Sequence, residues 1–241
     1  MIIPAGRLHE HERLFVRVMT GPFGHLMVEW RQIIVFISIA SMVLGAVAGV
    51  NQRNIKRLMA YSSIGNIGYA LVGLAAGTAE GIRGLLIYMA IYLCMTIGTF
   101  ACILSMRRKG VMVEEIVDLA GLSRSNPLAA AALALFMFSM AGIPPLAGFF
   151  GKLYVFLPAI TEHLYALAVI GVVSSVIGAY YYLRIIKVMY FDEPAPGFDR
   201  TQGREVSVIL AISGLAILLF FVVPGPLLGA AQAAAASLFG G

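Results

Sequence analysis

The sequence predicts an all-α polytopic membrane protein with about seven transmembrane helices, one of them interrupted between Gly142 and Lys152. Composition is the first observation behind this prediction. Of the 241 residues, 60% are hydrophobic and 12% are charged, and the mean hydropathy is +0.91. Because soluble domains contain about 25% charged residues, this composition excludes a soluble globule, and it also excludes a disordered chain.

The second observation is where the charges lie. They separate six uncharged windows of 21 to 36 residues, and a membrane-spanning helix needs about 20 mostly apolar residues. The net charge of +5 does not indicate nucleic-acid binding, because the basic residues flank apolar runs as they do at membrane surfaces. The windows are 32–52, 58–79, 84–106, 125–151, 163–183 and 206–241.

In chain order, the first three spans are predicted at 33–50, 58–76 and 84–105. A polar break at 51–57 separates the first two. The longest polar stretch, 106–126, follows the third span. Its apolar residues fit a short amphipathic helix lying on the membrane surface, and they are Val113, Ile116, Val117 and Leu119.

The fourth window is expected to hold an interrupted helix. Its first half begins at Pro127, because proline suits the first turn of a helix. About 15 residues later two prolines remove two backbone donors and end the helix, and a new helix begins near residue 146. The residues assigned to this interruption are Gly142, Pro144, Pro145, Gly148 and Gly151.

A long span at 164–190 and a last span at 206–223 complete the predicted bundle, with a Pro- and Gly-bearing loop at 192–204 between them. The tyrosines of YYYLRIIKVMY suit a membrane interface. We therefore divide the chain into an N-terminal segment with part of a helix (1–30), a membrane helix bundle (31–225) and an Ala-rich tail (226–241).

Lys152 is the residue most suggestive of function, because it stands between the apolar stretches AGFFG and LYVFL. A charged side chain at the bilayer centre costs at least about 2.5–3.5 kcal/mol on insertion scales. Such residues are therefore rare, and those that occur usually have a functional role. A lysine in such surroundings can take up and release a proton. The alternative is a lysine near a helix end whose stem lies in lipid and whose amine reaches the surface.

The second span is unusually polar. It is preceded by Arg53, Lys56 and Arg57, which could be interfacial anchors. Ser62, Ser63 and Tyr69 follow, together with Tyr61. A helix lined with hydroxyl groups could hold water and relay protons, or it could present a hydrogen-bonding face to neighbouring helices.

The sequence predicts no catalytic residues and no metal site. Cys94 and Cys102 are separated by eight residues of one predicted helix, roughly 12 Å, which is too far for a disulfide. The four histidines lie outside the predicted membrane spans and show no metal-ligand spacing. No cysteine set for an iron–sulfur cluster and no axial-ligand pair for haem occurs.

Three segments carry a family resemblance: QRNIKRLMAYSSIGNIGYALVG, DLAGLSRSNP and FMFSMAGIPPLAGFFGKLYVF. They resemble the antiporter-like membrane subunits of respiratory NADH:quinone oxidoreductase (complex I), and most closely the subunit N group of bacteria. The resemblance covers the chain from about Leu14 to the last span. The three motifs are specific in combination.

The resemblance implies proton translocation, coupled to quinone reduction elsewhere in a larger complex. In this family lysines, glutamates and water form an axis through the middle of the membrane. Lys152 matches the lysine of the interrupted helix, and Lys56 matches the lysine of the NIKRL-AYSS motif. Ser62, Ser63, Asn66 and Tyr69 would be relay or water-lining residues. Many relatives have a histidine where this chain has Asn66, and asparagine cannot titrate.

The resemblance also implies cofactors and partners in other chains. NADH, FMN, iron–sulfur clusters and quinone would be bound by other subunits, and none by this chain. The expected partners are other membrane subunits, including homologous antiporter-like ones, and the lipid bilayer, with no nucleic acid. The expected location is the bacterial inner membrane.

The chain departs from the family in length, because members are about twice as long. The first half, a mid-membrane glutamate and a first interrupted helix have no counterpart here, which predicts a C-terminal half. Two alternatives follow. The chain could serve a related cation/proton antiporter or membrane-bound hydrogenase, or it could be a truncated remnant with at most a structural role.

Overall fold

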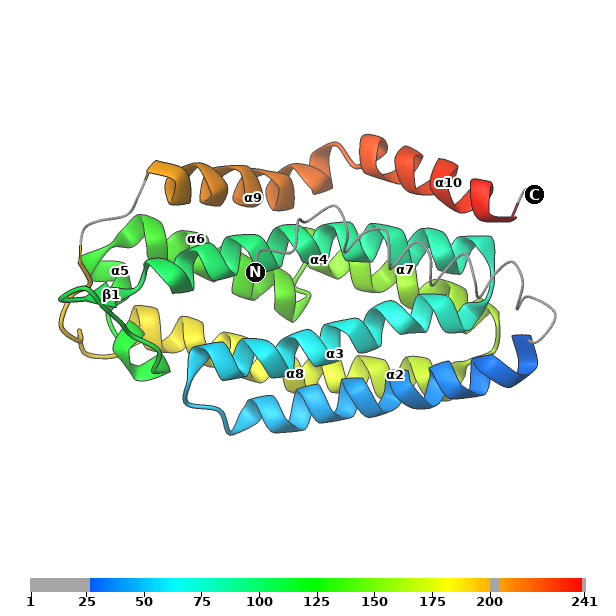
Figure 1. The fold of residues 1–241 in the computed structure, drawn as a ribbon, viewed down its shortest axis with the longest axis horizontal. Helices are drawn as coiled ribbons and strands as arrows, with labels where there is room; N and C mark the ends of the chain where they lie inside the picture. The colour runs from blue at the N-terminus through cyan, green and yellow to red at the C-terminus, as the bar shows by residue number, and fades with distance from the viewer. Residues whose placement is uncertain (1–26, 200–203, 240–241) are drawn as a thin grey trace.

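The computed structural model describes residues 27–199 and 204–239, which form a bundle of helices running along one long axis (Figure 1). Five helices are long and apolar enough to cross a membrane. The two shorter helices α6 and α7 form the predicted interrupted helix, which brings the described residues to six spans, roughly the predicted number. The predicted all-α class is confirmed. The helices are α2 (Met27–Val50), α3 (Ile55–Ala76), α4 (Ala79–Ser105), α6 (Pro127–Ala141), α7 (Ala147–Thr161), α8 (Tyr165–Phe191), α9 (Arg204–Val222) and α10 (Gly225–Phe239).

Local sequence explains where the central helices begin and end. Asn54 precedes α3 and accepts a hydrogen bond from the backbone of Arg57, and Thr78 caps α4 in the same way through Gly81. Such caps satisfy backbone N–H groups that have no partner within the helix. Gly77 ends α3 with a φ of 70°, a conformation that favours glycine.

Two arginines fasten the ends of neighbouring helices. Arg184 of α8 donates to the carbonyls of Val50 and Gln52, where α2 ends. Arg31 of α2 donates to the carbonyl of Ala75 at 2.8 Å, where α3 ends. A cation at a helix C-terminus satisfies free carbonyls and complements the helix dipole.

The segment 106–126 is not the amphipathic helix that its apolar pattern predicts. It forms a hairpin of β1 (Arg107–Arg108) and β2 (Val111–Met112), then a 3₁₀ turn, η2 (Ile116–Leu119), and the one-turn helix α5 (Leu122–Ser125). The Asp199 carboxylate accepts hydrogen bonds from two backbone N–H groups at the hairpin tip. These contacts favour a turn at Lys109 and Gly110, so the helix prediction was wrong.

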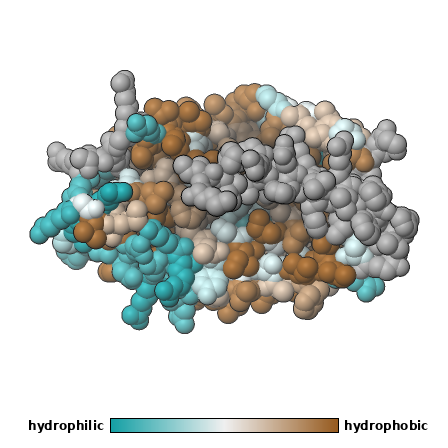
Figure 2. Space-filling model, in the orientation of Figure 1, coloured by the Kyte–Doolittle hydropathy of each residue, from teal (hydrophilic) through white to brown (hydrophobic). Residues whose placement is uncertain are grey.

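We call the end of the bundle that carries this hairpin the loop end. The surface there is hydrophilic, whereas much of the flank is hydrophobic (Figure 2). Large apolar side chains are exposed along the outer helices, among them Phe36 of α2, Val176 of α8 and Ile212 of α9. This distribution fits a bundle surrounded by lipid or by other membrane helices.

Candidate functional site

The site is built around the break between α6 and α7. Gly142 ends α6 with a φ of 82°, and its backbone N–H donates to Ser139. Pro144 and Pro145 lie between the two helices, joined by a cis peptide bond. Because α6 and α7 contain 15 residues each, roughly 22 Å of helix on either side, the break falls near the middle of the span.

The break is tightly packed on its inner side. The backbone N–H of Gly148, in the first turn of α7, donates to the Ser139 hydroxyl at 3.0 Å. A Cβ atom at position 148 would meet the Ser139 carbonyl oxygen. Gly151 lies one turn further along, against Tyr88 of α4. The sequence-predicted interruption residues therefore lie between the two helices or in the first turns of α7.

Lys152 reaches back from α7 into this break, and the residue is only 8% exposed. Its Nζ donates to the carbonyls of Met140 at 2.9 Å and Ala141 at 3.4 Å. It also donates to the Ser175 hydroxyl of α8 at 2.7 Å. The two carbonyls are the last of α6, where the helix dipole favours a cation.

An aromatic ring completes the surroundings of the amine. Nζ lies 5.0 Å from the centre of the Tyr69 ring, a distance at which a cation is attracted to the ring face. The Tyr69 hydroxyl in turn interacts with Ser175. Within the described ranges no carboxylate forms an ion pair with Lys152. The amine is therefore held by neutral groups.

A cluster of buried polar side chains continues from Tyr69 along α3. The Tyr88 hydroxyl donates to Asn66 Oδ1 at 2.6 Å. Asn66 Nδ2 donates to the Ser62 carbonyl at 2.8 Å and lies 3.3 Å from the Tyr182 hydroxyl. The hydroxyls of Ser62 and Tyr182 are 2.5 Å apart. Asn66 thus links helices α3, α4 and α8.

A second pair extends this cluster toward the loop end, where Tyr92 of α4 donates to the Ser63 hydroxyl at 2.8 Å. We call Ser62, Ser63, Asn66, Tyr88, Tyr92 and Tyr182 the polar cluster. The structure brings Ser62, Ser63 and Asn66 into it. Tyr69 lies beside it, with its ring 6.4 Å from that of Tyr88.

Sequence reasoning missed the partners supplied by α4 and α8. Tyr182 was assigned to the membrane interface, but the residue is 3% exposed and bonded inside the bundle, so that assignment was wrong. Tyr88 and Tyr92 are four residues apart, and this spacing on one helix face was the available signal. Ser175 had no distinguishing signal, because serine is common in helix-packing surfaces.

Lys56 lies elsewhere, in the first turn of α3 at the loop end. Its Nζ donates to the Glu114 carboxylate at 2.7 Å, and its side chain is 31% exposed. The hydrogen bonds from Lys56 and then Asn54 lower the pKa of Glu114. Because 13 residues separate Lys56 from Tyr69 on one helix, roughly 20 Å, the structure does not bring the two lysines together.

The comparisons with known proteins show the family. A family model for the transmembrane region of the NADH:quinone oxidoreductase/Mrp antiporter proteins matches residues 1–178. The chain belongs to this family. Two similar proteins are called NADH-quinone oxidoreductase subunit N: one from Paramagnetospirillum magneticum, 59% identical over 94% of this chain and 46% of that protein, and one from Beijerinckia indica, 62% identical over 93% and 47%. The chain spans about half the length of the curated relatives it matches.

Solved structures agree with the family. A chain of respiratory complex I from Thermus thermophilus with bound aureothin superposes with a TM-score of 0.71 at 30% identity, over 82% of this chain and 45% of that chain. A chain of the Mrp complex from Dietzia superposes with a TM-score of 0.79 over 93% and 50%. The latter is 23% identical, so it shows the shared fold alone.

Proposed function

We propose that this chain is a proton-translocating membrane subunit of a bacterial NADH:quinone oxidoreductase. Lys152 would hold and release the proton, and quinone would be reduced elsewhere in the complex. The observation that carries the proposal is the surroundings of Lys152: an amine at mid-span, 8% exposed, held by two helix-end carbonyls and one serine. Intramembrane ionisable groups that face a bundle interior mark ion and proton pathways.

The neighbours of Lys152 suit a group that changes charge. Carbonyl oxygens and a tyrosine ring favour the ammonium form, whereas burial disfavours it. The Ser175 hydroxyl can donate as well as accept, so it can stay bonded to the neutral amine. A proton arriving at or leaving Nζ would therefore not leave this group without a partner.

The polar cluster would connect Lys152 with the loop end. Its hydroxyl groups can each accept one proton and give up another, whereas Asn66 orients its neighbours without titrating. Lys56 would act at the surface end of the same helix, beside Glu114. Its place in the structure supports a role in proton entry rather than direct exchange with Lys152.

We further propose an orientation in the bacterial inner membrane. The basic groups of residues 53–57, 107–109 and 184–187 all lie at the loop end. At the opposite end of the bundle, the described residues include two arginines, Arg31 and Arg83, and no lysine. Cytoplasmic loops carry an excess of lysine and arginine, which supports an orientation with the loop end on the cytoplasmic side.

The proposal assigns the redox chemistry to partner chains. NADH, FMN, iron–sulfur clusters and quinone would be held by other subunits. Homologous antiporter-like subunits would lie beside this chain in the membrane. One of these partners would supply the carboxylate that exchanges protons with Lys152, since no carboxylate among the described residues of this chain forms an ion pair with it.

The test replaces Lys152 by alanine in the complete complex, with Lys152→Arg as the variant that keeps a charge but cannot give up its proton. Proton pumping and NADH oxidation are measured in inverted membrane vesicles. We expect both variants to assemble and both to lose pumping. Normal pumping by assembled Lys152→Ala would overturn the proposal. Sodium transport without NADH oxidation would assign the chain to an antiporter instead.

A further inference from the structure

A gap separates the polar cluster from the loop end along α3. Between Lys56 and Ser62 the buried positions of this helix are Leu58 and Met59, both 0% exposed. Six residues of helix correspond to about 9 Å. A proton that moves between the loop end and Ser63 therefore needs polar groups from another helix.

Helix α4 carries polar side chains at the level of this gap. Asn66 is bonded to Tyr88 and Ser63 to Tyr92, which fixes the antiparallel register of α3 and α4. Continued along both helices, that register places Thr96 level with Met59 and Thr99 level with Lys56.

Five residues with polar side chains form a continuous series along the second half of α4. Each lies three or four residues from the next, so neighbouring Cβ atoms are about 5–6 Å apart. We call this series the α4 ladder, and its members are Tyr92, Thr96, Thr99, Cys102 and Ser105.

Two members of the α4 ladder have unused hydrogen-bonding capacity. The hydroxyls of Thr96 and Thr99 are buried and have no hydrogen-bond partner in the described part of the chain, and Thr99 is 0% exposed. Ser63 and Ser105, by contrast, donate to carbonyls of their own helices. Buried hydroxyls without a protein partner are sites where ordered water binds.

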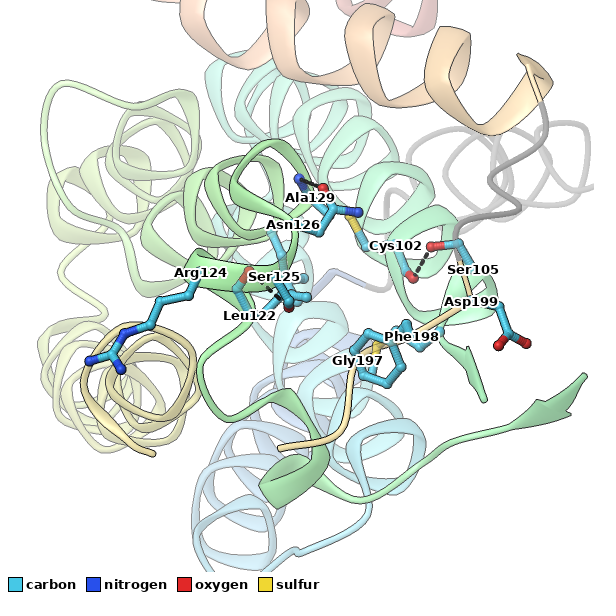
Figure 3. A pocket seen from close by; sticks show the side chains of 12 residues that line it. Cys102, Ser105, Leu122, Arg124, Ser125, Asn126, Ala129, Gly197, Phe198 and Asp199 are labelled. Carbon is cyan, nitrogen blue, oxygen red and sulfur yellow. Dashed lines mark hydrogen bonds between the residues drawn. The ribbon is translucent and has the colours of Figure 1, made fainter. Parts of the chain in front are cut away.

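The outer end of the α4 ladder lines a cavity at the loop end. Cys102 and Ser105 face a space that is bounded by Asn126, which caps the start of α6, and by Phe198 and Asp199 of the loop before α9 (Figure 3). Its volume is about 340 Å³, enough for several water molecules at roughly 30 Å³ each. Its lining includes the exposed residues Arg124 and Ser125.

We propose that water molecules bind along the α4 ladder and connect this cavity with Tyr92 and Ser63. The ligand is water and the proton it carries. The proton enters as hydronium in the cavity, each step moves one proton from one oxygen to the next, and no electron is transferred. The claim that this water carries a translocated proton rests on the proposed function. The claim that water is present does not.

The first experiment measures water access without measuring transport. Single-cysteine variants of the chain are assembled into the complex, and vesicles are exposed to Ag⁺ from the loop-end side. Reaction is read as loss of later labelling by a fluorescent maleimide after denaturation. The ladder variants are Thr99→Cys and Thr96→Cys without Cys94 and Cys102, and native Cys102 without Cys94. The matched control is Leu93→Cys, on the same helix with its native side chain 42% exposed on the outer surface.

We expect the ladder thiols to react on the order of 100-fold faster than the control, because a charged ion is excluded from an apolar membrane core. Native Cys102 needs no substitution within the ladder, so its result stands even if a threonine variant does not assemble. Ladder thiols that react as slowly as Leu93→Cys would overturn the proposal.

The second experiment compares Thr99→Val with Thr99→Ser in proton pumping. Valine removes the hydroxyl at nearly constant shape, and serine keeps it. We expect pumping to fall about tenfold with valine, the factor given by roughly one lost hydrogen bond, and to be retained with serine. Equal pumping by both would overturn proton transport along the ladder. If Ag⁺ reaches Thr99→Cys while Lys152→Ala pumps normally, the water path stands and the proposed function fails.

Discussion

The two lysines of this chain show two ways of placing a cation in a membrane protein. Lys152 is held at mid-span by two carbonyls of α6. These carbonyls are free to accept its hydrogen bonds because the helix is broken there. Lys56 lies at the loop end, where the carboxylate of Glu114, which follows the hairpin, and partial contact with water balance its charge. The first arrangement depends on backbone geometry, whereas the second depends on one opposite charge.

This difference determines what each site can do. An ion pair in contact with water is stable in one charge state and contributes little energy. A buried amine held by neutral groups has no permanent counter-charge, so its protonation responds to charges that arrive from outside. Of the two lysines, it is therefore Lys152 to which our proposal assigns the translocated proton.

The largest effect is expected at the helix break. In Gly148→Val the new side chain would meet the Ser139 backbone, which cannot move without displacing α6. Overpacking costs about 1–3 kcal/mol and more where backbone must shift. We expect the variant to be lost from the assembled complex, as judged by immunoblots of purified membranes. Gly229→Val is the control, because a Cβ at Gly229 has no atom within 4 Å, and normal assembly of both would contradict a rigid break.

Much of this fold could be predicted because membrane helices are specified by simple local rules. Proline at 144 and 145 and glycine at 142 end one helix and begin another whatever surrounds them. Lys152 stood out because no other charge interrupts its apolar window. Both signals are local. The first located the helix break, and the structure shows the Lys152 amine bonded to the end of α6 at that break.

The rest depended on contacts between segments far apart in the sequence. Tyr182 pairs with Ser62, 120 residues away, so its sequence neighbours suggested a membrane interface instead. The hairpin after α4 is held by Asp199, about 90 residues later. Lys56 shares a polar helix with Tyr69, but only the helix length shows that the two lie at different depths.

An intermediate effect is expected from Tyr182→Phe, which removes one hydroxyl from the polar cluster. Ser62 and Asn66 would lose a partner but keep their bond to each other, so we expect destabilisation of about 0.5–1.5 kcal/mol. The measurement is the thermal unfolding of the purified complex, followed through this chain. Tyr180→Phe is the matched control, because Tyr180 is 56% exposed. An equal shift in both variants would show that the hydroxyl of Tyr182 is not important to the cluster.

The smallest effect is expected at the loop end, from Glu114→Gln. The hydrogen bonds of Lys56 and then Asn54 hold the pKa of Glu114 below its ordinary value of 4.5. A carboxylate with a lowered pKa stabilises the fold above its unfolded pKa, and this contribution is lost as the pH falls through the folded value. We therefore expect Glu114→Gln to increase amide hydrogen exchange in residues 107–116 at neutral pH, and to leave it unchanged at a pH well below 4.5.

The neighbouring substitution Glu115→Gln is the control for this last effect, because its exposed side chain forms no hydrogen bond or ion pair among residues 27–199 and 204–239. It should leave exchange unchanged at both pH values. A difference between Glu114→Gln and the parent that persists in acid would mean that the carboxylate acts by its shape rather than its charge. Lys56 would then be balanced by neutral groups, as Lys152 is, and the distinction between the two lysines would rest on depth alone.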